Sequence, residues 1–481
     1  PQPLTLEFLL RYWKATGANR ALDMVTLTLT KMASGGMYDQ LGGGFHRYST
    51  DSYWLVPHFE KMLYDNALLT SVYLHAWQET NAPLFRSVIE QTLEYVLREM
   101  THDNGGFYSA QDADSEGKEG KFFVWLSQDV DALLGKEDGG IFKAFYDVSD
   151  FGNWEGQNIL HVPELFEDMS EKLGVSESDL LTVLARSRSK LLASRSERIR
   201  PGLDDKVLAS WNGMMMASFA ECGSVLGEER WVQAAIRNAE FVLTELRVRG
   251  RLKRTWRENK RGDGLAKLNG YLEDYASVAV GLIMLYEATF EHRWIDEAVT
   301  LVDEMIDLFW SSEDQVFYDT GVDHEQLVVK PRDVFDNAAP SGGSLAATSL
   351  LRLAVLTGRS EYNQMALKSI QSVCDFVERV PSGMANWLSA IDFLIGTKQE
   401  IVIVGPSDDP ATSALLDIAR RDYAPNRVLA GSEGLIEPAH SPIFEKRDLV
   451  NGKPTAYVCE NYACELPVNT PEDLAVQLSS G

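Results

Sequence analysis

The side chains best suited to chemistry gather between Gly35 and Thr80, in the stretch GGMYDQLGGGFHRYSTDSYWLVPHFEKMLYDNALLTSVYLHAWQET. The cluster consists of His46, Arg47, Tyr48, Trp54 and His58. Aromatic faces and a guanidinium group are what a protein uses to stack against and orient a sugar ring, so these residues are candidates for a substrate site. A packed rim loop, in which they serve only the fold, is the other interpretation.

A helix is predicted to begin at Pro57, because the fixed φ angle and missing N–H of proline suit the first helical position. This helix would run to about Thr80 and would place His58 and Asp65 on one side. The positive end of the helix dipole and the charge of Lys61 disfavour protonation of His58, and a neutral imidazole is what a general base needs. The alternative is that His58 only caps or packs the start of the helix.

Abstraction of a proton next to a carbonyl, the reaction of sugar epimerases, needs a base on each side of the substrate carbon. His58 would be one base, and His324 or His46 the other. The chain has only eight histidines, so replacing each in turn tests this hypothesis.

Acidic residues are further candidates. Asp112, in SAQDADSEG, could bind a metal or act as an acid or base. The segment imitates the start of an EF-hand loop, but Phe123 stands where the bidentate glutamate belongs, which excludes calcium of that type. A solvated hairpin turn is the alternative. The chain has no HExxH, paired CxxC or phosphate-binding glycine motif, and we expect no metal or cofactor.

A third group stands where polar loops give way to apolar helices: Asp205, Trp211, Asn212, Glu273 and Asp274. Two carboxylates about 5–10 Å apart across a cavity would support glycoside hydrolysis, with retention at the short end and inversion at the long end. Capping of helix starts, which Asp and Asn favour, is the alternative. The sequence GGSLA from Gly342 approaches a nucleophile elbow, but a proline-bearing loop precedes it where a strand is required.

The elements that must position these residues are mostly helical. Helices are predicted at 4–16, 19–33, 57–80, 82–100, 126–134, 139–146, 176–194, from about 206, at 229–248, from about 270, at 292–310, from about 337, and at 361–378 and 383–395, with two short strands between 107 and 125. Aligning Asp65, Asn212, Asp274 and Ser344 as polar-to-apolar transitions gives separations of 147, 62 and 70 residues. Such a repeat predicts paired helices in a closed ring or an open solenoid. In a ring, the starts of the inner helices would meet at one opening.

The composition changes after Gly396. EIVIVG from Glu400 predicts a buried strand, followed by a helix at 410–421, strands at 427–430 and 455–459, and a helix at 471–478. We therefore predict a helical domain over 1–396 and a small α/β region over 397–481. The α/β region is interpreted as packing structure, because it lacks a dinucleotide or phosphate-binding fingerprint.

Charge and cysteine content limit the partners. The 481 residues carry 45 Lys and Arg against 71 Asp and Glu, a formal net charge of -26, so the surface should repel nucleic acid and anionic membranes. Four cysteines are too few for a disulfide scaffold, which fits a reducing cytoplasm. No apolar run is long enough to cross a bilayer, and no secretory signal opens the chain. Because the first residue is not Met, we expect a longer parent protein.

Five motifs occur in order: the long stretch described first, then LDDKVLASWNG, GYLEDYA, APSGGS and AYVCENYACELPV. With them the chain resembles the spermatogenesis-associated protein 20-like family, also described as thioredoxin domain-containing, over essentially its whole length. The resemblance implies a thioredoxin-like domain, absent here, fused to an (α/α)6 toroid of the six-hairpin glycosidase type, similar to N-acylglucosamine 2-epimerases. Cys459 and Cys464 do not form a CxxC pair, which argues against a redox role for this chain.

We therefore expect a mainly α protein, an (α/α)6 toroid of helical hairpins with short β-hairpin insertions and a small C-terminal α/β region, in the cytoplasm. It would bind a sugar or sugar-like molecule and isomerise, epimerise or hydrolyse it by acid–base chemistry without a cofactor. The predicted catalytic residues are His58, Asp65 and Asp274. The predicted substrate-binding residues are His46, Arg47, Tyr48, Trp54, Asp112, Asp205, Trp211, Asn212, Glu273 and His324. The rival hypothesis is a noncatalytic scaffold that binds a partner or serves the missing thioredoxin-like domain.

Overall fold

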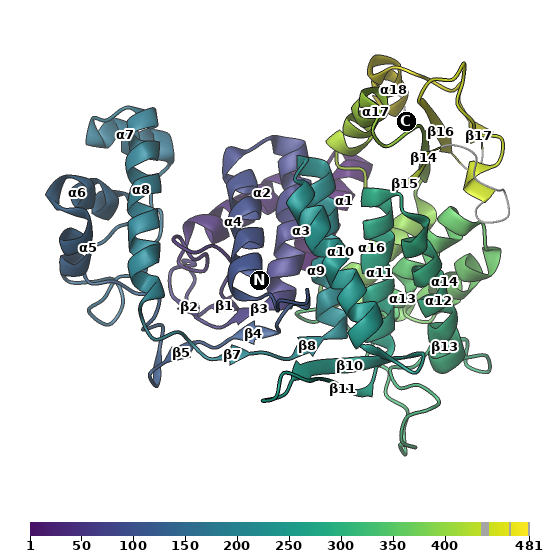
Figure 1. Cartoon of the computed structure of the whole chain (residues 1–481), viewed down its shortest axis with the longest axis horizontal. Helices are drawn as coiled ribbons and strands as arrows, with labels where there is room; N and C mark the ends of the chain where they lie inside the picture. Colours follow the sequence, from purple (N-terminus) through teal and green to yellow (C-terminus); the bar gives the residue numbers. More distant parts are fainter. Residues whose placement is uncertain (434–441, 461–462, 480–481) are drawn as a thin grey trace.

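Six helices form a closed ring at the centre of the molecule (Figure 1). The computed structural model describes residues 1–433, 442–460 and 463–479. The ring helices are α1 (Pro3–Thr16), α3 (Leu63–Thr80), α9 (Ala209–Leu226), α11 (Leu272–Thr289), α13 (Gly342–Thr357) and α16 (Ala385–Ile395). Each contacts the next in this order, and α16 contacts α1, so the ring closes within the described residues. The predicted (α/α)6 toroid is confirmed, and the open solenoid is excluded.

An outer helix follows most of the ring helices directly. These outer helices are α2 (Asn19–Ser34), α4 (Pro83–Glu99), α10 (Glu229–Glu245), α12 (His292–Phe309) and α14 (Ser360–Gln371), the last continued by the short α15 (Cys374–Arg379). The sequence explains the two layers: α11 is buried almost all round, whereas α12 buries only one stripe that includes Ile295, Ala298, Val302 and Met305. Nowhere in the described ranges is a helix both long and apolar enough to span a lipid bilayer.

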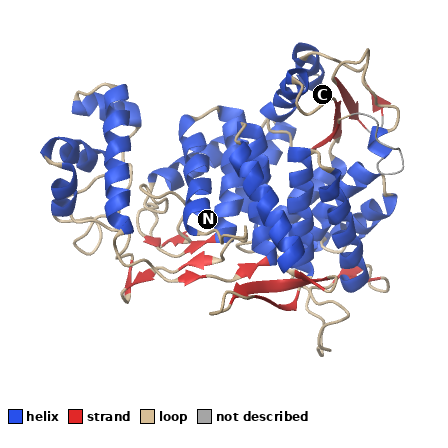
Figure 2. Ribbon diagram, in the orientation of Figure 1, coloured by secondary structure: helices blue, strands red, loops and turns tan. Residues whose placement is uncertain are grey.

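Short strands connect the starts of the ring helices into a rim (Figure 2). One sheet contains β3 (Lys61–Met62), β4 (Ala110–Gln111) and β7 (Leu203–Asp204), and another contains β8 (Val207–Leu208), β9 (Arg247–Val248), β10 (Arg251–Glu258) and β11 (Gly264–Asn269). Separate pairs are β1 (Tyr48–Ser49) with β2 (Pro57–His58), β5 (Asp114–Ser115) with β6 (Lys118–Glu119), and β12 (Trp310–Ser311) with β13 (Val316–Phe317). The sequence did not predict the hairpin of β10 and β11. Only Leu252 and Trp256 of the hairpin are buried, and no apolar alternation marks its strands.

The helix predicted from Pro57 is wrong at its start. Pro57 and His58 form β2, which pairs with Ser49 and Tyr48, and α3 begins only at Leu63. The backbone N–H of Arg47 also donates to Glu60 O at 2.7 Å, which keeps this segment extended. His58 and Asp65 therefore do not share a helix face.

The predicted internal repeat is present, but its first copy aligns one residue later in the chain than predicted. Asn66 accepts from Phe45 N at 2.7 Å, and its Nδ2 donates to Met62 O at 2.8 Å. Asn212 accepts from Phe107 N at 2.8 Å, and its Nδ2 donates to Leu208 O at 2.9 Å. The equivalent of Asn212 is thus Asn66 rather than Asp65, and both asparagines hold a loop against the start of a ring helix.

The C-terminal region closes the end of the ring opposite the rim (Figure 1). Its sheet has the order β15-β14-β16-β17, with β14 (Gln399–Val404) parallel to β15 (Arg427–Ser432) and antiparallel to β16 (Thr455–Glu460), which pairs with β17 (Ala463–Cys464). Helices α17 (Pro410–Arg421) and α18 (Pro471–Ser479) complete it. Strand β15 contacts α11 and α13, and α17 contacts α9, so this region is fixed to the ring.

Four helices lie outside the ring and form a separate lobe (Figure 1). They are α5 (Ser127–Leu134), α6 (Lys136–Phe145), α7 (Phe166–Leu173) and α8 (Glu177–Ser196), and they share a hydrophobic core of their own. Sequence periodicity predicted most of these helices but not their exclusion from the ring, because a helix buried against a lobe has the same pattern as one buried against a ring.

A buried ionic cluster attaches this lobe to the rim. Asp39 contacts Lys61 Nζ at 2.8 Å and both terminal nitrogens of Arg195, from α8, at 2.8 Å. The residues are between 1% and 6% exposed. Burial alone would raise the pKa of Asp39, but Arg195 and Lys61 outweigh it and hold the pKa well below its ordinary value.

Replacing Asp39 tests this cluster. Asp39→Asn leaves two cations buried without a counter-charge, and we expect a loss of about 3–5 kcal/mol of unfolding free energy. The folded pKa is depressed, so this contribution is present above the unfolded pKa and is lost only as pH falls through the folded value. Urea denaturation from neutral to acid pH measures it. The control, Glu90→Gln in the exposed pair with Arg86 at 2.8 Å, should cost under about 1 kcal/mol. Equal costs for the two variants would contradict the assignment.

Candidate functional site

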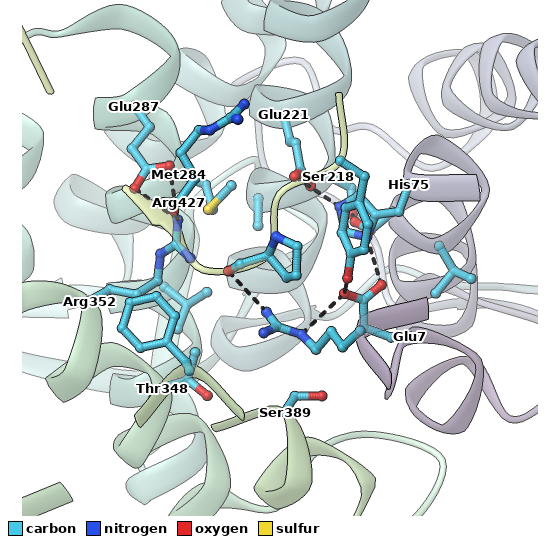
Figure 3. A pocket seen from close by; sticks show the side chains of 18 of the residues that line it. Glu7, His75, Ser218, Glu221, Met284, Glu287, Thr348, Arg352, Ser389 and Arg427 are labelled. Carbon is cyan, nitrogen blue, oxygen red and sulfur yellow. Dashed lines mark hydrogen bonds and ion pairs between the residues drawn. The ribbon is translucent and has the colours of Figure 1, made fainter. Parts of the chain in front are cut away.

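A cavity of about 300 Å³ lies inside the ring (Figure 3). All six ring helices contribute side chains to its wall. Residues between Ala419 and Leu429 of the C-terminal region form its floor. The volume is that of a small-molecule site, at the lower end of the usual range of about 300–1,000 Å³.

The wall residues follow the helical repeat. On α3 they are Leu68, Ser71, Val72, His75 and Gln78, and on α9 the matching positions are Met214, Ala217, Ser218, Glu221 and Ser224. On each helix these residues form one face, at steps of three and four. Small hydroxyl side chains line the wall and leave space for a ligand: Ser71, Ser218, Ser277, Thr348 and Ser389.

One side of the floor is an ionic cluster centred on His75. Its Nδ1 lies 2.6 Å from Glu7 Oε2 and its Nε2 lies 3.0 Å from Glu221 Oε1. The ring of Tyr423 stacks on the imidazole at 4.6 Å, and its hydroxyl donates to Glu7 Oε1 at 2.6 Å. Burial alone would lower the pKa of His75, but the two carboxylates raise it to about 10. His75 is therefore an imidazolium at neutral pH and cannot serve as a base.

The other side of the floor is built on Glu287. Arg352 Nη2 donates to its two carboxylate oxygens at 2.9 and 3.0 Å. Arg420, from α17, donates to the backbone carbonyl of Glu287 at 2.8 Å, and Arg427 also lines the floor. Burial raises the pKa of Glu287, although Arg352 opposes the shift. The two ionic clusters hold the C-terminal region on the ring.

Asp65 lies at the rim end of α3, one turn before the cavity-lining Leu68. It is 2% exposed, and its Oδ2 has no hydrogen-bond partner among the described residues. Burial raises its pKa to about 7, against the opposing charge of Arg47. A carboxyl with such a pKa is divided between its acid and base forms at neutral pH.

The rim brings several predicted residues together near Asp65. Arg47 pairs with Glu60 at 2.8 Å, and Glu60 lies 3.6 Å from His58 Nε2. His58 Nδ1 contacts Glu119 at 2.6 Å, and its ring stacks on Tyr48 at 5.1 Å. Trp211 follows the same helical stripe as Met214 and meets the ring of Tyr64 edge-on at 4.8 Å.

Asp274 and its neighbours occupy another part of the rim. Asp274 is fully buried, and its oxygens accept from Ser210 N at 3.1 Å and Tyr271 N at 2.9 Å. Arg254 contacts Asp274 at 3.3 Å and Glu273 at 2.6 Å. Burial raises the pKa of Asp274 to about 6. Its hydrogen bonds cap α11 and tie it to α9, as the capping alternative anticipates.

The remaining predicted residues are held in local structure. His46 is 2% exposed, its Nδ1 donates to Phe59 O at 2.8 Å, and burial lowers its pKa to about 3. His324 contacts Asp323 at 3.2 Å, and Asp205 contacts Arg257 at 2.5 Å. Trp54 accepts from Met37 N through its backbone oxygen, and Asp112 lies exposed in its turn, as the solvated alternative anticipates.

No residue predicted from the sequence is among the described residues that line the cavity. The residues that the sequence reasoning missed include His75, Glu221, Glu287 and Arg352. In α9, α11 and α13 their signal is a single charged residue in the second half of the helix, whereas the second half of α3 carries Glu79 as well as His75. A charged residue at such a position requires a partner or a polar space inside the ring.

Comparison with known proteins finds relatives by sequence. No protein-family model matches the chain. Spermatogenesis-associated protein 20 of Rattus norvegicus is 35% identical over 518 residues, which covers 98% of this chain and 65% of the relative. The Homo sapiens protein is 34% identical over 515 residues with the same coverage.

The chain is homologous to spermatogenesis-associated protein 20. The chain spans 65% of the length of the Rattus norvegicus protein and of the Homo sapiens protein. An uncharacterized protein of Caenorhabditis elegans is 26% identical over 507 residues, covering 98% of this chain and 69% of the relative. The family resemblance predicted from the five motifs is confirmed.

Solved structures resemble the chain only distantly. Cellobiose 2-epimerase from Bacillus thermoamylovorans is 8% identical with a TM-score of 0.41, covering 70% of this chain and 66% of that one. Unsaturated glucuronyl hydrolase from Bacillus sp. GL1 is 12% identical with a TM-score of 0.35, covering 82% and 96%. Likenesses at this level carry no functional conclusion, and the ring is established by the contacts among its own helices.

The pH dependence of stability tests the His75 cluster. The folded pKa of His75 is raised to about 10, so its contribution is fully present below the unfolded value and is lost as pH rises from about 6.5 to 10. We expect His75→Gln to cost about 3 kcal/mol at pH 6 and progressively less toward pH 10. Chemical denaturation across this range measures the difference.

The control is His161→Gln, because His161 faces the exposed Asp147 at 3.5 Å. It should cost under about 1 kcal/mol at every pH. If the cost of His75→Gln were independent of pH, the imidazole of His75 would stabilise the fold by packing and not by its charge.

Proposed function

We propose that the ring cavity binds a small, neutral, hydroxyl-rich molecule of the sugar type and that the protein converts it by acid–base chemistry. The observation that carries the proposal is the cavity of about 300 Å³, in which Glu7, Glu221 and Glu287 are paired with cations and the wall carries hydroxyl groups. This proposal differs from the expectation from sequence, because it places most of the binding groups on the ring helices.

The chemistry of the wall favours a neutral polar ligand. The carboxylates Glu7 and Glu287 already have cationic partners, so a cationic ligand would have to break a buried pair. A hydroxyl-rich ligand instead hydrogen-bonds to Ser277, Thr348 and Ser389 without displacing charge. Apolar side chains such as Leu68, Met214 and Phe393 line the same wall and suit the C–H faces of a sugar ring.

Asp65 is the acid–base group of the proposal. Its pKa of about 7 lets it give and take a proton at neutral pH, and its free oxygen is buried at the rim end of α3. We propose Arg47 and Trp211 as binding groups at the rim. His58 contacts Glu60, which pairs with Arg47, and the charges of Glu60 and Arg47 act on Asp65, so a positioning role is proposed for His58.

The solved structures that resemble the chain include sugar enzymes, but too distantly to support the proposal, which depends on the cavity. The noncatalytic alternative draws support from the same floor: its ion pairs hold the C-terminal region on the ring and have a structural use without any ligand. In that case no sugar would bind. Measuring sugar binding first and turnover second therefore distinguishes the enzyme from the noncatalytic protein.

Filling the cavity tests the binding site. We expect Thr348→Phe to weaken binding of the best ligand from a panel of reducing sugars and glycosides by more than about tenfold, because the ring of phenylalanine occupies the ligand volume. Ligand-observed NMR measures the affinity. Thr300→Phe is the matched control, because both threonines donate to the carbonyl four residues earlier and Thr300 lies exposed on outer helix α12.

Thr348→Ala, which enlarges the cavity, guards against misfolding of the larger variant and should keep binding within about tenfold. Unchanged affinity in folded Thr348→Phe would exclude the cavity as the site.

Asp65→Asn tests the acid–base role. We expect turnover of the bound sugar, followed by NMR and mass spectrometry, to fall by at least about 100-fold while binding persists. In the wild type, kcat/KM should depend on a group with a pKa of about 7, and Asp65→Asn should remove that dependence. His58→Ala should shift this pKa and keep most of the turnover, as a positioning role requires. Full activity of Asp65→Asn would refute the assignment.

A further inference from the structure

A disulfide lies at the edge of the C-terminal sheet, far in the chain from the residues of the ring cavity. Cys459 on β16 and Cys464 on β17 are register partners, and their sulfurs are bonded. Asn461 and Tyr462, between the two strands, lie outside the described residues. The five-residue spacing, taken from sequence as an argument against redox chemistry, is what a short antiparallel hairpin needs to bring two cysteines face to face.

The two sulfurs differ in access. Cys459 is 1% exposed, because β16 lies inside the sheet between β14 and β17. Cys464 is exposed on the outermost strand. An incoming thiolate therefore reaches Cys464, and Cys459 is the sulfur that leaves.

A cation stands next to both sulfurs. Arg447 Nη2 lies 3.1 Å from Cys459 Sγ and 3.2 Å from Cys464 Sγ. A guanidinium in this position stabilises a thiolate, and a stabilised thiolate is a better leaving group in thiol–disulfide exchange. Reactive cysteines occur in such partly exposed, positively charged surroundings, whereas structural cysteines do not need them.

There is also room for a partner at this site. A cavity of about 450 Å³ is lined by Cys464 and Arg447, together with Lys446, Glu465 and Pro442. It opens beside the exposed sulfur, where the loop that carries an attacking thiol has to fit.

A purely structural role explains these features less well. Strand β16 is already paired with β14 along its whole length, from Thr455 to Glu460. A cross-link that closes only a tight hairpin restricts the unfolded chain little, so it adds little stability.

We propose that Cys459 and Cys464 form a redox site that exchanges two electrons with an external protein dithiol. A thiolate of the partner attacks Cys464 Sγ, the Cys459–Cys464 bond breaks, and Cys459 leaves as a thiolate beside Arg447. The partner's second thiolate then attacks the partner's first sulfur in the mixed disulfide. This step forms a disulfide within the partner and releases Cys464 as a thiolate. Both cysteines take a proton from water, so the pair is reduced and the dithiol is oxidised.

The test uses the full chain with Cys374→Ser, because Cys374 is the exposed free cysteine and Cys222 is buried. The oxidised protein is mixed with dithiothreitol as the dithiol probe or glutathione as the monothiol probe, then alkylated, and the peptide carrying residues 459–464 is weighed. We expect reversible two-electron reduction under native conditions, faster with the dithiol. A Cys459→Ser variant treated with oxidised glutathione should accumulate the glutathione mixed disulfide on Cys464, with one reduced glutathione released, because the sulfur that would resolve it is missing.

Arg447→Met should slow reduction by about threefold or more, since the leaving thiolate loses its cation. Lys453→Met, which removes an exposed cation that does not line this cavity, should leave the rate unchanged. Equal slowing by both variants would overturn the role of Arg447. A pair that is reduced only when the protein unfolds, or that never oxidises, would overturn the redox site itself.

Discussion

The contact between α1 and α16 closes the ring, and the cavity depends on this closure. Arg11 on α1 contacts Asp392 on α16 at 3.1 Å and Asn426 of the C-terminal region at 3.3 Å. One turn earlier on α1, Glu7 reaches across to His75. A single helix thus joins its two ring neighbours and the floor. Without it, the polar inner faces of the other helices would line an open groove, and the buried charges of the floor would be exposed to water on one side.

The two ends of the ring serve different purposes. At the floor, charge-assisted hydrogen bonds connect Glu7, His75 and Tyr423. They hold the pKa of Glu7 and the pKa of His75 far from neutral pH. At the rim, Asp65 is buried without a full set of partners, and its pKa lies near neutral pH. Fixed charges stabilise the assembly, whereas a group that titrates near neutrality is suited to proton transfer.

Helical periodicity and the internal repeat predicted paired helices in a closed ring or an open solenoid, and the family resemblance implied the ring. Local patterns also predicted β14, β15 and β16 of the C-terminal sheet but not β17. The sequence was insufficient for the pairing of short rim strands: Pro57 suits a helix start and a strand edge equally, and only the contact with Ser49 decides between them. The exclusion of α5 to α8 from the ring also depends on a distant contact, that of Arg195 with Asp39.

The site was harder to predict than the fold for the same reason. Polar loop residues attract attention in a sequence, yet Asn212 and Asp274 use their hydrogen bonds on neighbouring backbone. His75, Glu221 and Arg352 look like isolated charges in apolar helices until the ring closes and brings them around one space. The residues that define their role lie more than a hundred positions away in the chain, as the contact between His75 and Glu221 illustrates.

The most direct test of the central claim is a crystal structure of the protein with its tightest-binding sugar. The account predicts the ligand inside the ring, hydrogen-bonded to the hydroxyl groups of Thr348 and Ser389 and lying above the floor formed by His75 and Arg352. A sugar bound elsewhere on the protein, with the ring cavity filled by water alone, would contradict it.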